Sequence, residues 1–352
     1  MLSVPEGIAL AKQTRRILEI EDLCKYFPVT RGFLGRNRGT VKAVDGVSFF
    51  INEGETLALV GESGCGKTTT AHCVVRGIEP TSGEIRYYEN DALPEDIAKA
   101  KKAELKRIRR NIRMVFQDPY SSLNARMTIM EIIGEPLLIN QSVKSRKELE
   151  EKVVEIIRMV GIDPAYLNRY PHAFSGGQRQ RIAVARALVL KPKIVIADEP
   201  VSALDVSVQA QILNLLKELQ AEFALTYLFI AHNLAVVKHQ SDRVAIMYLG
   251  KIVELADSEK LFSKPKHPYT EALLSSAPNP DPRMRNRNQI ALKGDIANPL
   301  SPPNGCSFHP RCLYSKDICR TSEPTLTKLA SNDTHRVACH FAEELSLRGI
   351  DG

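Results

Sequence analysis

The feature that most limits the fold of this chain is an apolar run that ends in a glycine-rich loop and leads into a helix-forming stretch. Thr56–Val60 is the apolar run, and Gly61–Thr68 reads GESGCGKT, which matches the pattern G-x-x-x-x-G-K-[ST]. Glycines let the backbone wrap closely around a phosphate so that successive N–H groups point at its oxygens. Lys67 would reach the β- and γ-phosphates of a nucleotide, and the Thr68 hydroxyl would bind Mg²⁺. Strand, glycine loop and helix in this order predict an α/β fold.

A second strand pattern ends in two carboxylates. Lys193–Ala197 is apolar, and Asp198 and Glu199 follow it directly. A carboxylate at the end of a buried strand beside the glycine loop can hold Mg²⁺ through water. The next carboxylate can act as a general base toward the attacking water. The alternative is that the two residues only end a strand and cap the next helix.

A third pattern, Phe174-Ser-Gly-Gly-Gln178, opens another helix and resembles a second anion site. The helix from about Gly176 to Leu190 would be about 22 Å long at 1.5 Å per residue, and its far end leads into the Asp198 strand. Ser175 would therefore lie roughly 20 Å from the magnesium site of its own chain. Two such sites suit one nucleotide only if two chains meet head to tail, which predicts an ATP-dependent dimer.

The order of GESGCGKTT, FSGGQ, IVIADE, SALD and IAHN resembles the ATPase subunits of ABC transporters, from about Leu18 to Phe262. The resemblance implies a P-loop NTPase core of the ABC ATPase type, with a β-rich N-terminal subdomain and a helical subdomain at about 119–190. Phe174, Cys65 and Asn233 depart from the family's usual Leu, Ser and Asp, and none of them removes a group that the chemistry needs.

The resemblance also assigns roles to residues. The glutamine in VFQDP contacts Mg²⁺ and the attacking water, the histidine in IAHN senses the γ-phosphate, and Ser202–Asp205 crosses the dimer interface. Phe27, with Tyr26 as runner-up, stacks on adenine; the alternative for both is an ordinary core aromatic. The expected catalytic residues are Lys67, Gln117, Glu199 and His232. The expected nucleotide-binding residues are Phe27, Gly61, Glu62, Ser63, Gly64, Cys65, Gly66, Lys67, Thr68, Thr69, Gln117, Ser175, Gly176, Gly177, Gln178 and Asp198, with Thr68, Gln117 and Asp198 holding Mg²⁺.

Longer segments resemble the peptide importers within this family. They are QDPYSSLNARMTI, DEPVSALDVSVQAQILNLL, KHPYTEALL and the tail NPLSPPNGCSFHPRC, while YFPVTRGFLGRNRGTVKAVDGVSF resembles the second of the two ATPase subunits of such importers. The resemblance implies an ATPase that powers uptake of oligopeptides or dipeptides, with nickel or another small solute as alternatives. It also implies two membrane-spanning permease subunits, a second and different ATPase subunit, and an extracytoplasmic substrate-binding protein as partners.

The chain has no apolar run near the roughly 18 to 20 residues of a membrane span, and no secretory signal is evident. We therefore expect a peripheral protein on the cytoplasmic face of the membrane. A rival interpretation is a non-transport ATPase that acts on nucleic acid through the basic stretch Lys99–Arg113. The net charge of +7 does not decide between them, because a solvated helix face explains the same stretch. We expect no nucleic-acid partner.

The composition changes after about Ser263, where proline becomes frequent, so we expect an ATPase domain over 1–262 and an extension over 263–352. The extension holds Cys306, Cys312, Cys319 and Cys339. The family resemblance favours a [4Fe–4S] cluster on these cysteines. Zinc, with help from nearby histidines (His309, His335 and His340), and unmetallated thiols stay open, as does a redox-sensing role. Cys24 and Cys73 are expected to be buried small hydrophobes.

Overall fold

The computed structural model describes residues 15–31, 36–89, 93–276, 290, 297–330 and 332–350. Its strands are β1 (Arg16–Arg31), β2 (Arg36–Asn52), β3 (Thr56–Val60), β4 (Ser82–Tyr87), β5 (Glu95–Asp96), β6 (Ile112–Val115), β7 (Ile194–Asp198), β8 (Thr226–Ala231), β9 (Arg243–Tyr248), β10 (Lys251–Asp257), β11 (Thr327–Leu329) and β12 (Asn332–Val337). Its helices are α1 (Lys67–Val74), α2 (Lys102–Asn111), α3 (Pro119–Ser122), α4 (Ile129–Ile139), α5 (Arg146–Met159), α6 (Gly176–Leu188), α7 (Val206–Phe223), α8 (Leu234–Gln240), α9 (Ser258–Ser263), α10 (Pro268–Ser276) and α11 (Ile318–Thr321), with 3₁₀ turns η1 (Pro164–Tyr166), η2 (Pro171–Ala173) and η4 (His309–Arg311).

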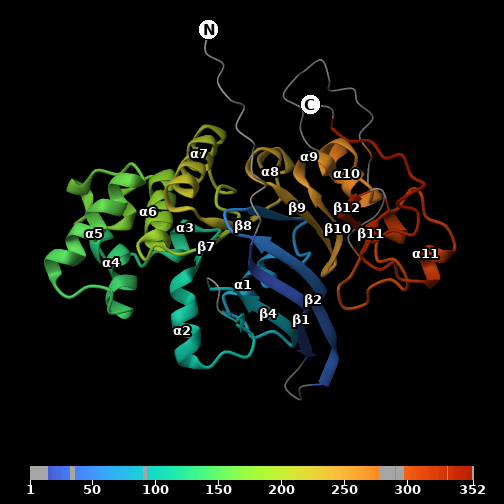
Figure 1. The fold of residues 1–352 in the computed structure, drawn as a ribbon, viewed down its shortest axis with the longest axis horizontal. Coiled ribbons are helices and arrows are strands. Elements are labelled where there is room, and N and C mark those ends of the chain that lie inside the picture. Colours follow the sequence, from blue (N-terminus) through green and yellow to red (C-terminus); the bar gives the residue numbers. More distant parts are fainter. Residues whose placement is uncertain are drawn as a thin grey trace, which may run out of the picture.

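The larger sheet has the strand order β11-β12-β10-β9-β3-β8-β7-β6, and its strands lie in the centre and on the right of Figure 1, beside the helices α4–α6. From β6 to β9 neighbouring strands are parallel, so their carboxyl ends meet at one edge of the sheet. Ligands of open α/β sheets bind at this edge. At the other side of β3, β9 and β10 form an antiparallel hairpin that turns at Leu249–Gly250. The α/β fold expected from the glycine loop is therefore confirmed.

The parallel strands are buried on both faces. In β3, Leu57 and Leu59 face one core and Ala58 and Val60 face another, as the two-residue period of a strand requires. The first core lies between the two sheets and includes residues of α1, and the second includes residues of α4–α7. Because both faces are covered, the strands read as continuous apolar runs in the sequence.

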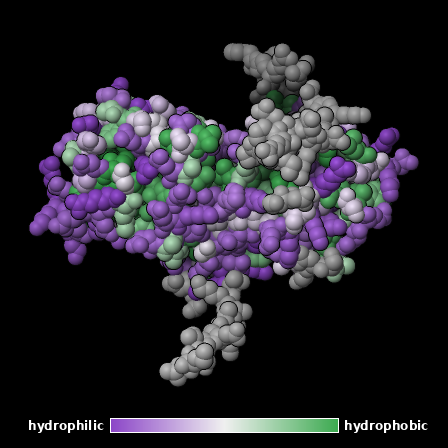
Figure 2. Space-filling view, turned by 90° about the horizontal axis from the view of Figure 1, so that it is seen from above, coloured by the Kyte–Doolittle hydropathy of each residue, from purple (hydrophilic) through white to green (hydrophobic). Residues whose placement is uncertain are grey.

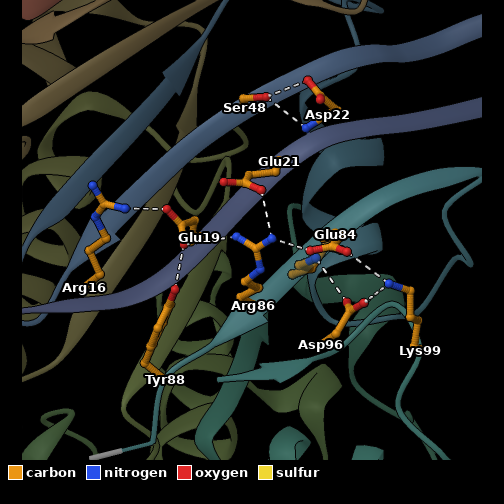
Figure 3. Close-up of polar contacts among 11 residues, drawn as sticks. Arg16, Glu19, Glu21, Asp22, Ser48, Glu84, Arg86, Tyr88, Asp96 and Lys99 are labelled. Atoms are coloured by element: carbon orange, nitrogen blue, oxygen red, sulfur yellow. Dashed lines mark hydrogen bonds and ion pairs between the residues drawn. The ribbon is translucent and has the colours of Figure 1, made fainter. Parts of the chain in front are cut away.

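The smaller sheet is antiparallel, in the order β2-β1-β4-β5. Its strands β1 and β2 are long and pair antiparallel from Arg16 and Asn52 to Arg31 and Arg36. Charged side chains bind one another across its surface. At their centre Arg86 contacts Glu19, Glu21 and Glu84, and Lys99 bridges Glu84 to a neighbouring carboxylate (Figure 3).

Helices α3–α6 form the side of the molecule that lies away from the extension (Figure 1). Figure 2 shows hydrophobic side chains gathered in patches on this half of the upper face, among hydrophilic ones. Large exposed apolar side chains of this region include Tyr120, Leu138, Ile139 and Tyr170. None of the helices within the described ranges has both the length and the apolarity needed to cross a membrane.

The C-terminal extension is bound to the rest of the molecule through the sheet and through an aromatic cluster. Strand β12 pairs antiparallel with β10, which places β11 and β12 at the edge of the larger sheet. Tyr248 of β9, Tyr269 of α10 and Phe308 lie with ring centroids 4.7 to 5.3 Å apart. Contacts of this kind contribute about 0.5–1.5 kcal/mol each beyond their buried area.

Candidate active site

The glycine loop lies between β3 and α1 and depends on backbone conformations that only glycine adopts readily. Gly64 and Gly66 have φ angles of 78° and 108°. A Cβ on Gly66 would lie 2.1 Å from the carbonyl oxygen of Ala43, and one on Gly61 would lie 2.2 Å from that of Met247. A side chain would therefore collide with backbone at both positions. The loop keeps a cradle of the kind that phosphate binding requires.

Lys67 lies inside this loop. Its Nζ donates hydrogen bonds to the carbonyl oxygens of Gly61 (2.8 Å) and Glu62 (2.9 Å). The side chain is buried, so its ammonium group is held at the loop where a β- or γ-phosphate would lie. Cys65 is buried as well, with its Sγ 3.7 Å from that ammonium group. Burial raises the pKa of the Cys65 thiol, which makes it a poor target for oxidation.

Thr68 and Asp198 meet as the sequence predicts. The Thr68 hydroxyl donates to Oδ1 of Asp198 at 3.1 Å, which joins the start of α1 to the end of β7. Mg²⁺ prefers oxygen ligands and keeps several waters, so a hydroxyl and a carboxylate in this position fit a nucleotide-bound magnesium ion. Burial and the nearby Glu199 carboxylate raise the pKa of Asp198.

Glu199 lies directly after β7, and two other predicted residues converge on it. Its Oε2 accepts a hydrogen bond from Nε2 of Gln117 at 2.9 Å and lies 3.1 Å from Nδ1 of His232. Gln117 follows β6 and His232 follows β8, so the three side chains come from the ends of neighbouring strands. The φ angle of Glu199 is 45°, a strained conformation for a residue with a side chain. Such strain occurs at functional sites, where surrounding contacts hold the residue in place.

The two aromatic candidates for the adenine contact differ in their surroundings. The Tyr26 hydroxyl donates to Asp45, and this bond raises the pKa of the tyrosine. Phe27 is 36% exposed, and the Lys25 ammonium lies 4.9 Å from the centre of its ring. The geometry thus favours Phe27 as a stacking surface.

The Ser175–Gln178 segment caps helix α6. The backbone N–H of Gln178 donates to the Ser175 hydroxyl, and the N–H of Ser175 donates to the Gln178 side chain. A Cβ on Gly177 would lie 2.5 Å from Val208 of α7, so a glycine is required there. The contacts described for these residues are within α6 or with neighbouring helices and loops, and the head-to-tail dimer stays a prediction.

The predicted iron–sulfur site needs correction. The four cysteines of the extension do line one small cavity. However, the described part of the chain contains no group of three or more His, Cys, Asp or Glu side chains arranged to hold a metal ion. Burial raises the pKa of Cys306, that of Cys312 to about 12 and that of Cys339 to about 11, so in the absence of a metal these three groups are neutral thiols.

The histidines that the zinc alternative required have other partners. Ring nitrogens of His309 and His340 lie at the carbonyl oxygens of Cys306 (3.0 Å) and Ser322 (2.9 Å). His335 binds the buried carboxylate of Glu254. The structure supports neither metal in the extension.

Much of the predicted basic stretch forms helix α2, and two of its arginines, Arg107 and Arg109, bind within the protein. Arg107 pairs with Glu89 and Glu95 of the N-terminal region, and Arg109 donates to the carbonyl oxygens of Val75 and Arg76. These contacts give the helix a structural role that needs no external polyanion.

Sequence reasoning missed two residues at the glycine loop. The Tyr269 hydroxyl accepts the backbone N–H of Glu62 at 3.0 Å, and Arg311 binds the Glu62 carboxylate through two bonds of 2.7 and 3.0 Å. Both lie more than 200 positions away in the sequence, and no local motif marks them.

These features define a nucleotide-hydrolysing ATPase of the P-loop class. They are the glycine loop that holds a lysine, the hydroxyl–carboxylate pair, and the carboxylate at the ends of the parallel strands. Comparisons with known proteins narrow this class. Residues 44–202 match the family model "ABC transporter", and residues 253–319 match "Oligopeptide/dipeptide transporter, C-terminal region". The chain belongs to the ABC transporter ATP-binding proteins, and its ATP hydrolysis, which uses Mg²⁺, is coupled to transport.

Relatives match over nearly the whole chain. The Oligopeptide transport ATP-binding protein AppF of Bacillus subtilis is 51% identical over 94% of this chain and 99% of its own. The Di/tripeptide transport ATP-binding protein DppF of Pseudomonas aeruginosa is 48% identical over 93% and 98%. Among solved structures, the ATP-binding cassette MJ0796 bound to ADP and Pi is 28% identical, with a TM-score of 0.59 over 69% of this chain and 99% of that one. The expected family and fold are therefore confirmed.

Proposed function

We propose that this protein is the ATP-hydrolysing subunit of an importer that takes up oligopeptides or dipeptides. The observation that carries the ATPase chemistry is the meeting of Gln117 and His232 on the Glu199 carboxylate, beside the Thr68–Asp198 pair. The peptide substrate is supported by the names of the relatives, which are peptide transport proteins, and by the match of residues 253–319 to a peptide-transporter region.

Each residue has a role in this proposal. The backbone of Gly61–Thr69 and the Lys67 ammonium bind the phosphates, and Phe27 stacks on adenine. Thr68, Asp198 and Gln117 supply oxygens to Mg²⁺, which neutralises phosphate charge when it is bound. Glu199 accepts a proton from the attacking water, and Gln117 orients that water.

His232 completes the site in the proposal by placing its imidazole at the γ-phosphate. Its other contact, with Glu199, joins the γ-phosphate position to the general base. In a head-to-tail dimer, the segment of the second ATPase subunit that matches Ser175–Gln178 would close over the nucleotide, with the N–H groups at the start of its helix facing the phosphates. Charge that develops on the γ-phosphate is then met by donors from both subunits.

The proposal includes the assembly. Two membrane-spanning permease subunits bind the protein at the cytoplasmic face of the membrane, a different ATPase paralogue forms the head-to-tail partner, and an extracytoplasmic binding protein delivers the substrate. We also propose the division into an ATPase domain over 1–262, with a helical subdomain at about 119–190, and an extension over 263–352.

Purification from membranes tests the proposal. A tagged chain extracted in mild detergent should carry two permease subunits and a second ATPase, and cells should lose uptake of labelled peptides when Lys67→Ala replaces the wild type. The control is Lys147→Ala, an exposed lysine of α5, which should leave uptake unchanged. Recovery of the chain with nucleic acid and no permease would overturn the proposal. Loss of nickel uptake with normal peptide uptake in the Lys67→Ala cells would overturn the assignment of peptides as the substrate.

A further inference from the structure

Glu62 is the second residue of the glycine loop, and contacts occupy each of its polar groups. Its N–H donates to the Tyr269 hydroxyl, and its carbonyl oxygen accepts from Lys67 Nζ. Its carboxylate accepts both terminal nitrogens of Arg311, at 2.7 and 3.0 Å. Two of the three groups are thus bound by the extension, Tyr269 from α10 and Arg311 from η4.

Arg311 is built into the extension. Its side chain is only 7% exposed, and its guanidinium lies 6.0 Å from the centre of the Tyr248 ring. Phe308 packs against Tyr248 and Tyr269, so the arginine lies beside the aromatic cluster that joins the extension to the core. A two-bond arginine–carboxylate pair in such a setting holds the orientation of the carboxylate and also neutralises its charge.

The position of Glu62 gives this pair a consequence for nucleotide binding. A free carboxylate in a loop that wraps around phosphates would repel them, and in a half-buried site that repulsion is screened less than in water. Arg311 neutralises the carboxylate and keeps it turned toward the extension. The backbone of residues 61 and 62, which also holds Lys67, is fixed by the same contacts.

We propose that Arg311 is a positioning residue for ATP binding: the C-terminal extension sets the charge and the shape of the phosphate loop through Glu62. The proposal rests on the proposed binding of the ATP phosphates at Gly61–Thr69. It gives the extension a direct role in the ATPase site, in addition to any contact with other subunits.

The test measures ATP binding to the purified full-length protein. Arg311→Ala should raise the Kd for ATP by about tenfold or more, the size expected when one charge near the phosphates loses its partner. The rise should be smaller for AMP, which has fewer phosphate charges. Arg311→Lys keeps the charge but loses the two-bond fork, so its Kd should lie between those of the wild type and Arg311→Ala.

A second substitution separates charge from simple loss of structure. Adding Glu62→Gln to Arg311→Ala removes the unpaired carboxylate and should return the Kd to within about threefold of the wild type. The matched control is Arg320→Ala, an exposed arginine of α11, which should bind ATP as the wild type does. An unchanged Kd in Arg311→Ala would overturn the proposal, as would a loss that Glu62→Gln does not reduce.

Two further measurements cover the case in which Arg311→Ala does not fold and separate the role of Arg311 from the proposed function. If Arg311→Ala does not fold, Arg311→Lys still decides it: this variant must weaken ATP binding, and adding Glu62→Gln to it must recover part of the loss. Lys67→Ala must abolish ATP binding if the loop is the ATP site. If Lys67→Ala binds ATP normally, the proposed function fails; if it does not bind and Arg311→Ala does, only the role of Arg311 fails.

Discussion

The strand ends around Glu199 and the C-terminal extension both lie at the glycine loop, but different features of the fold place their side chains there. At the strand ends, each functional side chain comes from a short motif that follows its own buried strand, and the parallel sheet brings the motifs together. In the extension, the important contacts join residues far apart in the chain, such as Arg311 with Glu62 and His335 with Glu254. The comparison shows that backbone topology assembles one region and buried charge pairs assemble the other.

The two regions also use carboxylates differently. Glu199 keeps part of its side chain exposed, so water can approach the oxygen that Gln117 and His232 hold. Glu254 is fully buried and accepts hydrogen bonds from His335 (2.7 Å) and from the backbone N–H groups of Lys266 (2.7 Å) and His267 (3.0 Å). The first carboxylate is placed for chemistry, and the second joins β10, β12 and the segment before α10.

The largest effect that the comparison predicts is on turnover. Glu199→Gln keeps the size of the side chain and removes the base, so ATP hydrolysis should fall by about 10²- to 10⁴-fold while ATP still binds. Turnover of the assembled transporter and titration with a fluorescent ATP analogue measure the two properties separately. We also expect the variant to accumulate as an ATP-bound dimer.

Glu218→Gln on α7 is the matched control, since Glu218 is exposed and distant in sequence from the strand ends. It should hydrolyse ATP at the wild-type rate. Glu199→Gln with more than about a tenth of wild-type turnover contradicts the role of Glu199 as general base.

The second effect is on stability and tests whether buried pairs hold the extension. His335→Ala removes one of the three partners of the buried Glu254 carboxylate and should lower the free energy of unfolding by about 2 kcal/mol. Urea unfolding, followed by circular dichroism, measures it. His340→Ala removes an imidazole that contacts a carbonyl oxygen near the surface, and it should change stability by less than about 0.5 kcal/mol. Equal losses in the two variants would show that burial of the pair does not matter.

The difference between the regions explains what could be predicted from the sequence. Strand, loop and helix patterns are local, so the positions of Lys67, Asp198 and Glu199 follow from short stretches of chain and from the geometry of a parallel sheet. The family resemblance places Gln117 and His232 at the site, but their contact with Glu199 depends on β6, β7 and β8 being neighbours, which the structure supplies. A resemblance that covers the motifs in order strengthens each of these predictions.

In the extension, no short sequence motif predicts which side chains contact one another. The family resemblance favoured a cluster on its four cysteines, but the described residues contain no group arranged to hold a metal, and the nearby histidines have other partners. The contact of Arg311 with Glu62 spans 249 positions and depends on how the aromatic cluster packs. Side-chain partners this far apart in the chain are set by tertiary packing, and a single sequence taken alone carries no signal for it.

The smallest predicted effect comes from the surface of the smaller sheet and completes the comparison. Arg86 contacts three carboxylates there, more than Arg311 does (Figure 3), but its side chain is 30% exposed and those of its partners are 12 to 50% exposed. Water and salt screen exposed pairs, so their number says little about stability. Arg86→Ala should therefore leave the urea midpoint within experimental scatter of the wild type, at low and at high salt, in the same assay as His335→Ala. A loss as large as that of His335→Ala would mean that the number of ion pairs, and not their burial, stabilises this fold.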